Sequence, residues 1–221
     1  MLAQLQLKTP SRRWRVSRLR VLIAVVGTVL LMGLVSGFVW WPRSPTDLGH
    51  AGRAATSQWL SAWQAGEIVA LVRHTERCDR SSNPCLGPAD GITQVGSEAA
   101  AAVGRGFTQL GMQQAEVLSS PLTRTVQTAH YMFGSDAVTQ DWLATCGPTL
   151  RDDVVAHKSA GHNLVLVTHS GCISDFEKQT GYPHAVTAEY GSALLLRVDA
   201  HGQLKVLGII NPVAWSQIKN Q

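Results

Sequence analysis

Two arginines and a histidine stand together where a short apolar run ends. Ile68 to Val72 is almost continuously apolar, as expected for a strand that is buried on both faces, and Arg73, His74 and Arg77 follow it. A neutral imidazole is a competent nucleophile, and a guanidinium presents a rigid fork of donors that matches phosphate oxygens. Phosphoryl transfer requires little beyond positioning and charge neutralisation. The trio therefore indicates phosphate-ester chemistry; the competing interpretation is an ordinary solvated loop after a strand.

A second histidine occupies an equivalent place further along the chain. The apolar run Leu164 to Thr168 ends in His169, so two strands each deliver a histidine at their carboxyl ends. Arg124 lies in the first turn of a helix that follows another short strand, where the helix N-terminus itself favours an anion. Ligands of open α/β sheets bind outside the carboxyl ends of the strands. These side chains are therefore expected to share one crevice, although a solvated helix arginine is the alternative for Arg124.

The elements that must position these residues alternate between strands and helices. Pro121 is expected at the N-terminus of the helix that carries Arg124, and Gly111 after the end of an earlier, small-residue helix. The last two strands are expected to pair through the turn Asp199 to Gly202. The expected helices are 96–110, 121–133, 148–157 and 173–180, and the expected strands are 68–72, 115–118, 137–143, 162–168, 192–198 and 204–210. This alternation predicts an α/β domain.

The basic character of the chain is confined to its beginning. Six of the 19 Lys and Arg residues precede residue 21, so the other 13 face all 15 Asp and Glu residues and leave a formal charge near −2. The positive total of +4 therefore gives no support to nucleic-acid binding.

Residues 21–41 contain no charged residue and follow that basic segment, which predicts a transmembrane helix with residues 1–20 in the cytoplasm. Trp40 and Trp41 fall where an interfacial aromatic belt is expected. A cleaved signal peptide is the rival interpretation, because Val35-Ser36-Gly37 loosely resembles a cleavage site. Both interpretations export residues 42–221. Residues 42–66 are expected to be a tether containing one short helix, and residues 67–221 the functional domain.

Four cysteines fit an exported chain. Cys78 and Cys85 enclose a short polar loop that a disulfide could close, which would leave Cys146 to pair with Cys172, although the sequence allows three connectivities. A zinc site is the alternative, and the spacing of the first two cysteines does not suit it.

The residues described above resemble the histidine phosphatase superfamily. LVRHTER is similar to its first motif, SSPLTRTVQTA to its second and LVTHSG to its third. Within the superfamily, RHTERCDRSSNPCLGPADGIT and all four cysteines resemble the exported phosphatases that act on heptose phosphate of the lipopolysaccharide core. The resemblance implies a three-layer αβα sandwich with a mostly parallel central sheet, preceded here by one N-terminal transmembrane helix.

The resemblance also implies roles for the matching residues. His74 would be the nucleophile that carries a phosphohistidine, and Arg73, Arg77, Arg124 and His169 would bind the phosphoryl oxygens. No metal or other cofactor is needed, since the arginines neutralise the charge.

Two departures from the family pattern concern catalysis. Thr75 stands where the family often has glycine, which would narrow the approach to His74, and Ser170 replaces the Asp that one branch has after its second histidine. The general acid is left open among four carboxylates. Glu76 is favoured because it is nearest in sequence to the nucleophile, ahead of Asp152, Asp153 and Glu189, although an ion pair with an arginine would also explain Glu76.

Together these patterns predict an exported phosphomonoesterase at the periplasmic side of the inner membrane, or in the periplasm after cleavage. Its expected partners are a phosphorylated small molecule or glycolipid, with lipopolysaccharide heptose phosphate as the preferred substrate, and the membrane through residues 21–41. The alternative from another functional class is a catalytically silent protein that binds a phosphorylated envelope glycan or a partner. A phosphoglycerate mutase is a third hypothesis, which export disfavours because its cytosolic substrates would be absent.

Overall fold

The structure, a computed structural model, describes residues 12–40 and 43–220, with side chains described for 17–38 and 43–216. The chain divides into two compact units between Pro42 and Arg43.

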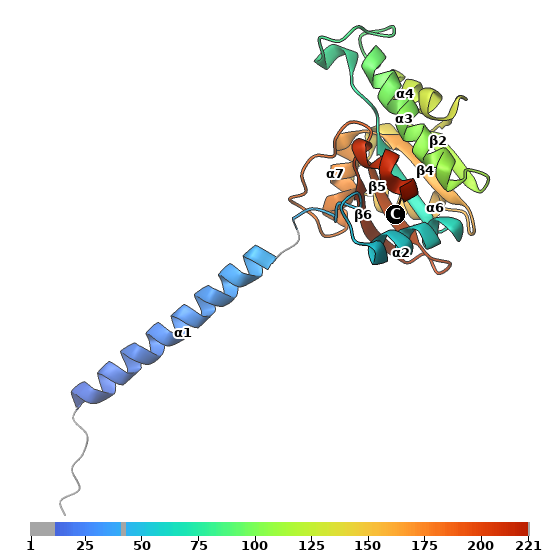
Figure 1. The fold of residues 1–221 in the computed structure, drawn as a ribbon. Helices are drawn as coiled ribbons and strands as arrows, with labels where there is room; N and C mark the ends of the chain where they lie inside the picture. Colours follow the sequence, from blue (N-terminus) through green and yellow to red (C-terminus); the bar gives the residue numbers. More distant parts are fainter. Residues whose placement is uncertain (1–11, 41–42, 221) are drawn as a thin grey trace, which may run out of the picture. The chain divides into compact units, whose positions relative to one another are not determined.

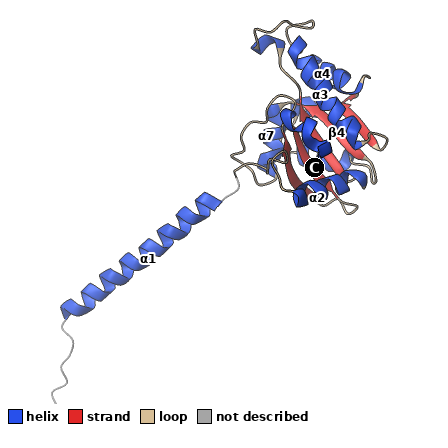
Figure 2. Cartoon of the chain, in the orientation of Figure 1, coloured by secondary structure: helices blue, strands red, loops and turns tan. Residues whose placement is uncertain are grey.

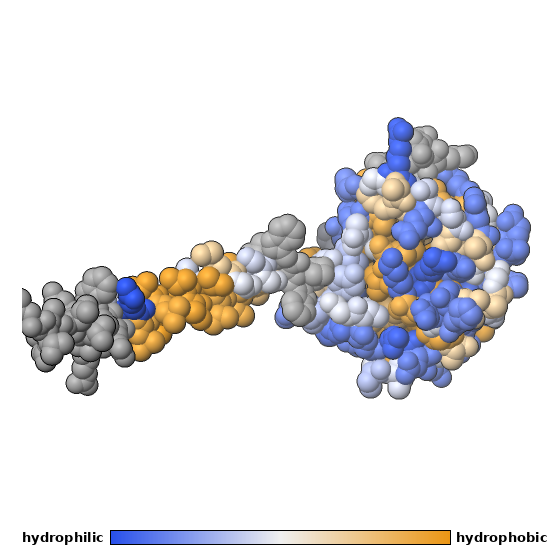
Figure 3. All heavy atoms as spheres, turned by 90° about the horizontal axis from the view of Figure 1, so that it is seen from below, coloured by the Kyte–Doolittle hydropathy of each residue, from blue (hydrophilic) through white to orange (hydrophobic). Residues whose placement is uncertain are grey.

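The first unit contains one long helix, α1 (Arg12–Trp40). Its stretch Ser17–Phe38 is apolar and long enough to cross a membrane, and these side chains are exposed along its whole length. Figure 3 shows the apolar band on this helix. The helix expected over 21–41 is confirmed through residue 40, whereas most of the basic segment 1–20 and Trp41 lie outside the described residues.

The second unit is built on a six-stranded sheet in the order β3-β2-β4-β1-β5-β6. Figure 2 shows this sheet in red, with helices packed around it. The first four strands of this order are parallel, while β5 runs antiparallel to both of its neighbours. The mostly parallel sheet is thus confirmed, as is the C-terminal hairpin. The strands are β1 (Ile68–Arg73), β2 (Ala115–Ser119), β3 (Val138–Thr139), β4 (Asn163–Thr168), β5 (Ala193–Val198) and β6 (Leu204–Ile210).

Helices cover both faces of the sheet, which gives the three layers expected from the sequence (Figure 1). Alternate side chains of β1 enter two different cores: Ile68, Ala70 and Val72 pack in one, and Val69 and Leu71 in the other. The first core is closed by α2 (Arg53–Gln64), α3 (Gln94–Leu110), α4 (Thr123–Phe133) and η2 (Pro212–Asn220), and the second by α5 (Trp142–Thr145), α6 (Leu150–His157) and α7 (Ser170–Gln179).

The segment expected to be a tether folds onto the domain instead. Trp59 and Trp63 of α2 are buried in the first core, and Leu48 is buried beside them. Burying two tryptophans removes a large apolar area from water, which explains why residues 43–66 are held against the sheet.

Three local expectations also need correction. Only Val138 and Thr139 of the segment 137–143 form a strand, because α5 begins at Trp142. Pro121 lies one residue before the N-cap of α4, which is Leu122. The helix α7 begins at Ser170, three residues earlier than expected, so that His169 is its N-cap.

Both disulfides expected from the spacing are present, Cys78–Cys85 and Cys146–Cys172. The first closes the loop that begins with η1 (Cys78–Arg80), and the second joins the end of α5 to the first turn of α7. A bridge thus braces the chain beside each of the two histidine-bearing strand ends.

Candidate active site

The ends of three neighbouring strands bring the candidate residues together. Because β1, β4 and β2 are adjacent and parallel, their carboxyl ends meet at one edge of the sheet. The end of β1 supplies Arg73 and His74, the end of β4 supplies His169, and the end of β2 leads to Ser120. Arg124 enters from the first turn of α4. The rings of His74 and His169 are 5.4 Å apart between centroids.

His74 is held in one tautomer. Its Nδ1 donates a hydrogen bond of 2.8 Å to the carbonyl oxygen of Thr75, so the proton is on Nδ1 and the lone pair is on Nε2. The residue is only 3% exposed, and this burial lowers the pKa of His74 to about 3, with His169, Arg124 and Arg73 acting in the same direction and the bond to Thr75 opposing it. The imidazole is therefore neutral at physiological pH, as a nucleophile must be.

His169 is also neutral and is held by a serine. Its Nε2 lies 2.9 Å from Oγ of Ser120, whereas its Nδ1 is buried without a hydrogen-bond partner among the described residues. Burial, together with the charges of Arg124 and Arg77, lowers the pKa of His169 to about 4. An anion bound beside His169 would relieve the repulsion between the guanidinium groups of Arg77 and Arg124.

Arg73 and Arg124 are partly buried cations. Arg73 donates from Nη1 to the carbonyl oxygen of Ala188 at 2.5 Å, and its Cζ lies 3.9 Å above the ring of Tyr190. Burial lowers the pKa of both arginines, and the Nε of each is buried without a partner in the described part of the chain. Two desolvated guanidinium groups with free donors favour an anionic ligand of the size of a phosphoryl group.

Arg77 is engaged with an acidic neighbour. Its Nε donates to Oδ1 of Asp79 at 2.8 Å and its Nη2 donates to Oδ2 of the same carboxylate. The structure therefore brings Arg77 close to Arg124 and His169, which feel its charge, but its bidentate fork is occupied.

The side chain of Thr75, which was expected to narrow the approach to His74, is directed toward α4. The residue is fully buried, its amide donates to Oγ1 of Thr128 on α4, and its hydroxyl lies 3.3 Å from the same oxygen. Its side chain is thus turned to α4, and it fastens the loop after β1 without covering His74.

Glu76, favoured as the general acid, forms hydrogen bonds that hold a neighbouring loop. Its Oε2 accepts hydrogen bonds from Thr93 at 2.6 Å and from Asn83 at 2.9 Å, and these bonds lower the pKa of the carboxyl. A carboxylate that is held ionised is a poor proton donor. Glu76 makes no hydrogen bond to either histidine in the described part of the chain, so its role as the general acid stays a prediction, and its side chain anchors the loop that ends at Thr93, the N-cap of α3.

The other carboxylates proposed from the sequence are not better placed. Asp153 accepts from the hydroxyl of Thr149 and Asp152 is exposed, both on α6. Glu189 is exposed in the segment between α7 and β5. Neither His74 nor His169 makes a hydrogen bond to a carboxylate within the described residues.

Two residues of the site were missed by sequence reasoning. Ser120 lies within the quoted SSPLTRTVQTA stretch and follows a strand, which was an available signal. Tyr190, whose ring centroid is 5.7 Å from that of His74, lies in an irregular segment far along the chain and carried no signal.

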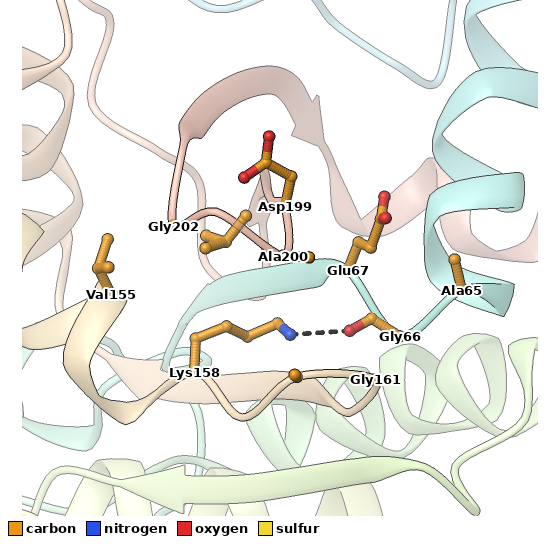
Figure 4. A pocket seen from close by; sticks show the side chains of 11 residues that line it. Ala65, Gly66, Glu67, Val155, Lys158, Gly161, Asp199, Ala200 and Gly202 are labelled. Atoms are coloured by element: carbon orange, nitrogen blue, oxygen red, sulfur yellow. Dashed lines mark hydrogen bonds between the residues drawn. The ribbon is translucent and has the colours of Figure 1, made fainter.

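Within the described residues, no group of three or more His, Cys, Asp and Glu side chains is placed to hold a metal ion. A separate cavity of about 280 Å³ lies at the opposite edge of the sheet, beside Gly66, Lys158 and Asp199 (Figure 4). There Nζ of Lys158 donates to the carbonyl oxygen of Gly66, and no histidine lines the cavity.

Comparison with known proteins agrees with this geometry. The family model of the histidine phosphatase superfamily (branch 1) matches residues 69–143, a range that includes Arg73, His74, Arg77 and Arg124. A lipopolysaccharide core heptose(II)-phosphate phosphatase from Salmonella newport (strain SL254) is 31% identical over 163 residues, which are 72% of this chain and 78% of the relative.

Two solved structures share the fold. A phosphoglycerate mutase from Bacillus anthracis str. Sterne superposes with a TM-score of 0.50 at 13% identity, covering 71% of this chain and 99% of its own. A phosphoserine phosphatase from Entamoeba histolytica, in complex with 3-phosphoglyceric acid, gives a TM-score of 0.51 at 14% identity, covering 65% and 96%. The sequence relationship, the shared fold and the paired histidines lead to one conclusion: this chain belongs to the histidine phosphatase superfamily and is a phosphoric monoester hydrolase.

Proposed function

We propose that this chain is an exported phosphomonoesterase that transfers the phosphoryl group of its substrate to Nε2 of His74 and then to water. The observation that carries the proposal is the state of His74, which is neutral, has its lone pair on Nε2 and lies against His169. In this mechanism Nε2 attacks phosphorus in line with the ester oxygen, and Arg73, Arg124 and His169 bind the equatorial oxygens. Arg77 joins them by exchanging Asp79 for a phosphate oxygen.

The mechanism depends on charge matching in a desolvated pocket. Two guanidinium groups that lack partners for their Nε atoms balance the two negative charges of a phosphate monoester. Arg73 is positioned before substrate arrives, because it donates to the carbonyl oxygen of Ala188 and stacks on Tyr190, and the backbone of Arg124 lies in the first turn of α4. Preorganised donors of this kind lower the barrier because they need not reorient in the transition state.

The substrate that we propose is a phosphate on heptose of the lipopolysaccharide core. The names of the curated relatives, which share 31% identity over about three quarters of their length, support this choice. The apolar helix α1 and the two disulfides support a location outside the cytoplasm, since disulfides persist in oxidising compartments. We place the domain at the periplasmic side of the inner membrane, anchored by α1.

The test uses the full chain in detergent with a panel of phosphate esters that includes purified lipopolysaccharide. The wild-type protein should release phosphate from lipopolysaccharide, and rapid acid quenching should trap a phosphoenzyme whose label is lost in His74→Ala. Equal phosphate release by both proteins would refute the mechanism. Activity on small esters without release from lipopolysaccharide would refute only the proposed substrate.

A further inference from the structure

The proposed reaction lacks an evident proton donor for the leaving oxygen. When the ester bond breaks, an alkoxide leaves and must be protonated, a step that contributes about 10²–10⁴-fold to rates. The two carboxylates whose charges act on Arg124 already have partners: Asp79 binds Arg77, and Asp90 accepts from the hydroxyl of Thr123 at 2.7 Å. Glu189, between Ala188 and Tyr190, is exposed to solvent. Glu76 is held ionised by Thr93 and Asn83.

Tyr190 is the hydroxyl-bearing side chain that packs against the nucleophile. Its ring centroid lies 5.7 Å from that of His74, and the guanidinium of Arg73 stacks on its face. It follows Ala188 and Glu189 and precedes Gly191, in the segment that leads to β5. Three other hydroxyls near these strand ends already have partners: Ser120 contacts His169, Thr75 contacts Thr128, and Thr168 donates to the carbonyl oxygen of Leu143.

The backbone holds Tyr190 in place from both sides. The amide of Gly191 donates to the carbonyl oxygen of Arg73 at 3.1 Å, and the amide of Arg73 donates to Ser192 at 2.9 Å. The side chain of Arg73 binds the carbonyl oxygen of Ala188, on the other side of Tyr190. The segment that carries Tyr190 is therefore held against Arg73, the residue that precedes His74.

Two cations lie near the phenol group of Tyr190: Arg73, whose Cζ is 3.9 Å from the ring centroid, and Arg77. Burial lowers the pKa of Arg73, and the phenol group of Tyr190 acts in the opposite direction by raising it. Asp79 raises the pKa of Arg77, and Tyr190 raises it as well. The charges of Arg73 and Arg77 therefore both act on the phenol group of Tyr190.

We propose that Tyr190 is the general acid of the reaction, a role that rests on the phosphatase function proposed above. As Nε2 of His74 forms a bond to phosphorus, the bond between phosphorus and the ester oxygen breaks and the phenol proton passes to that oxygen, which leaves as an alcohol. The phenolate, balanced by Arg73 and Arg77, then takes a proton from the water that attacks the phosphohistidine. Phosphate is released, and both Tyr190 and His74 return to their starting states.

The test compares leaving groups in the full-length protein. Tyr190→Phe keeps the ring that supports Arg73 and removes only the hydroxyl, and Tyr131→Phe on α4 is the matched control at an exposed tyrosine. The value of kcat/KM, which reports phosphoryl transfer to His74, is measured on an alkyl phosphate and on 4-nitrophenyl phosphate, whose leaving group needs no proton. We expect Tyr190→Phe to lose roughly 100-fold or more on the alkyl ester and less than about 3-fold on the nitrophenyl ester.

An equal loss on both esters, or no loss on either, would overturn the assignment. Tyr190→Leu separates the two contributions of the residue, because it should lose activity on both esters once Arg73 has no ring to stack on. If the wild-type protein hydrolyses neither ester and forms no phosphoenzyme, the proposed function fails and not only the role of Tyr190.

Discussion

The hydroxyl of Ser120 lies 2.9 Å from Nε2 of His169, so that the end of β2 supports the histidine at the end of β4. The other ring nitrogen of His169 is buried without a partner in the described part of the chain. In the described part of the chain, a single hydrogen bond from the end of a neighbouring strand therefore orients this imidazole.

Ser120→Ala should lower kcat/KM about 10-fold, the equivalent of one lost hydrogen bond at roughly 1.4 kcal/mol, while the fold is retained. The measurement is steady-state hydrolysis of a phosphate ester, with thermal unfolding as a check on folding. Ser119→Ala is the matched control, because Ser119 is equally buried but its hydroxyl donates to the backbone carbonyl of Ser120. Similar losses in both variants would show that packing, and not the contact with His169, explains the effect.

Asp79 should compete with phosphate for Arg77. Asp79→Asn removes the carboxylate that occupies the guanidinium fork, so inorganic phosphate should inhibit the variant about 3- to 10-fold more tightly at low salt. The measurement is the competitive inhibition constant of phosphate. In Arg77→Ala the effect of Asp79→Asn should disappear, and its persistence in the double variant would mean that Asp79 acts on another group.

Acid should destabilise the domain through its buried histidines. The unfolded chain binds a proton at His74 near pH 6.5, while the folded protein does so only near pH 3, so stability falls as the pH drops through this window. His74→Asn removes this linkage, and between pH 6.5 and 4.5 it should lose about 2 kcal/mol less of its unfolding free energy than the wild type. Urea unfolding at a series of pH values measures the difference. Parallel pH curves would mean that His74 is accessible to protons in the folded state.

Much of the site could be predicted because its main residues follow regular elements. The apolar run that becomes β1 ends at Val72, directly before Arg73, and the run that becomes β4 ends at Thr168, directly before His169. Parallel strands bring these carboxyl ends to one edge of the sheet. Arg124 follows from the same logic, since a helix that starts after a strand begins at that edge. Periodicity and chain direction were sufficient for these residues.

The remaining residues depend on contacts between distant segments. Glu76 is ionised and structural because Asn83 and Thr93 reach it from an irregular loop, and no local pattern places that loop. Tyr190 reaches His74 from a turn-rich segment whose course is fixed by Arg73. The burial of α2, in contrast, could have been predicted locally. Trp59 and Trp63 are four residues apart and lie on one face of a helix, a spacing that indicates packing against a core.

The two disulfides should differ in their contribution to stability. Chain-entropy arguments give about 2.5 kcal/mol for Cys78–Cys85, which are 7 residues apart, and about 3.5 kcal/mol for Cys146–Cys172, which are 26 apart. Replacing Cys146 and Cys172 by alanine should therefore lower the unfolding temperature more than replacing Cys78 and Cys85. The shorter bridge should matter more for activity, because its loop carries the Asp79 that binds Arg77. Unfolding temperature and kcat/KM of the two paired variants test this separation of roles.

A buried carboxyl group on α7 should make the protein less stable as the pH rises from about 4.5 to 7. Glu177 is 1% exposed and neither of its carboxyl oxygens has a hydrogen-bond partner among the described residues, so burial raises its pKa to about 7. The folded protein keeps this proton where the unfolded chain has already lost it, between about pH 4.5 and 7, so the stabilising contribution is lost as the pH rises through 7.

Glu177→Gln stays neutral, and its unfolding free energy relative to the wild type should increase by about 2 kcal/mol between pH 5 and pH 8. Asp175→Asn on the same helix, which removes only an exposed pairing with Lys178, should show no such trend. A difference between Glu177→Gln and wild type that is independent of pH would mean that the carboxyl group is already ionised, or already hydrated, in the folded domain.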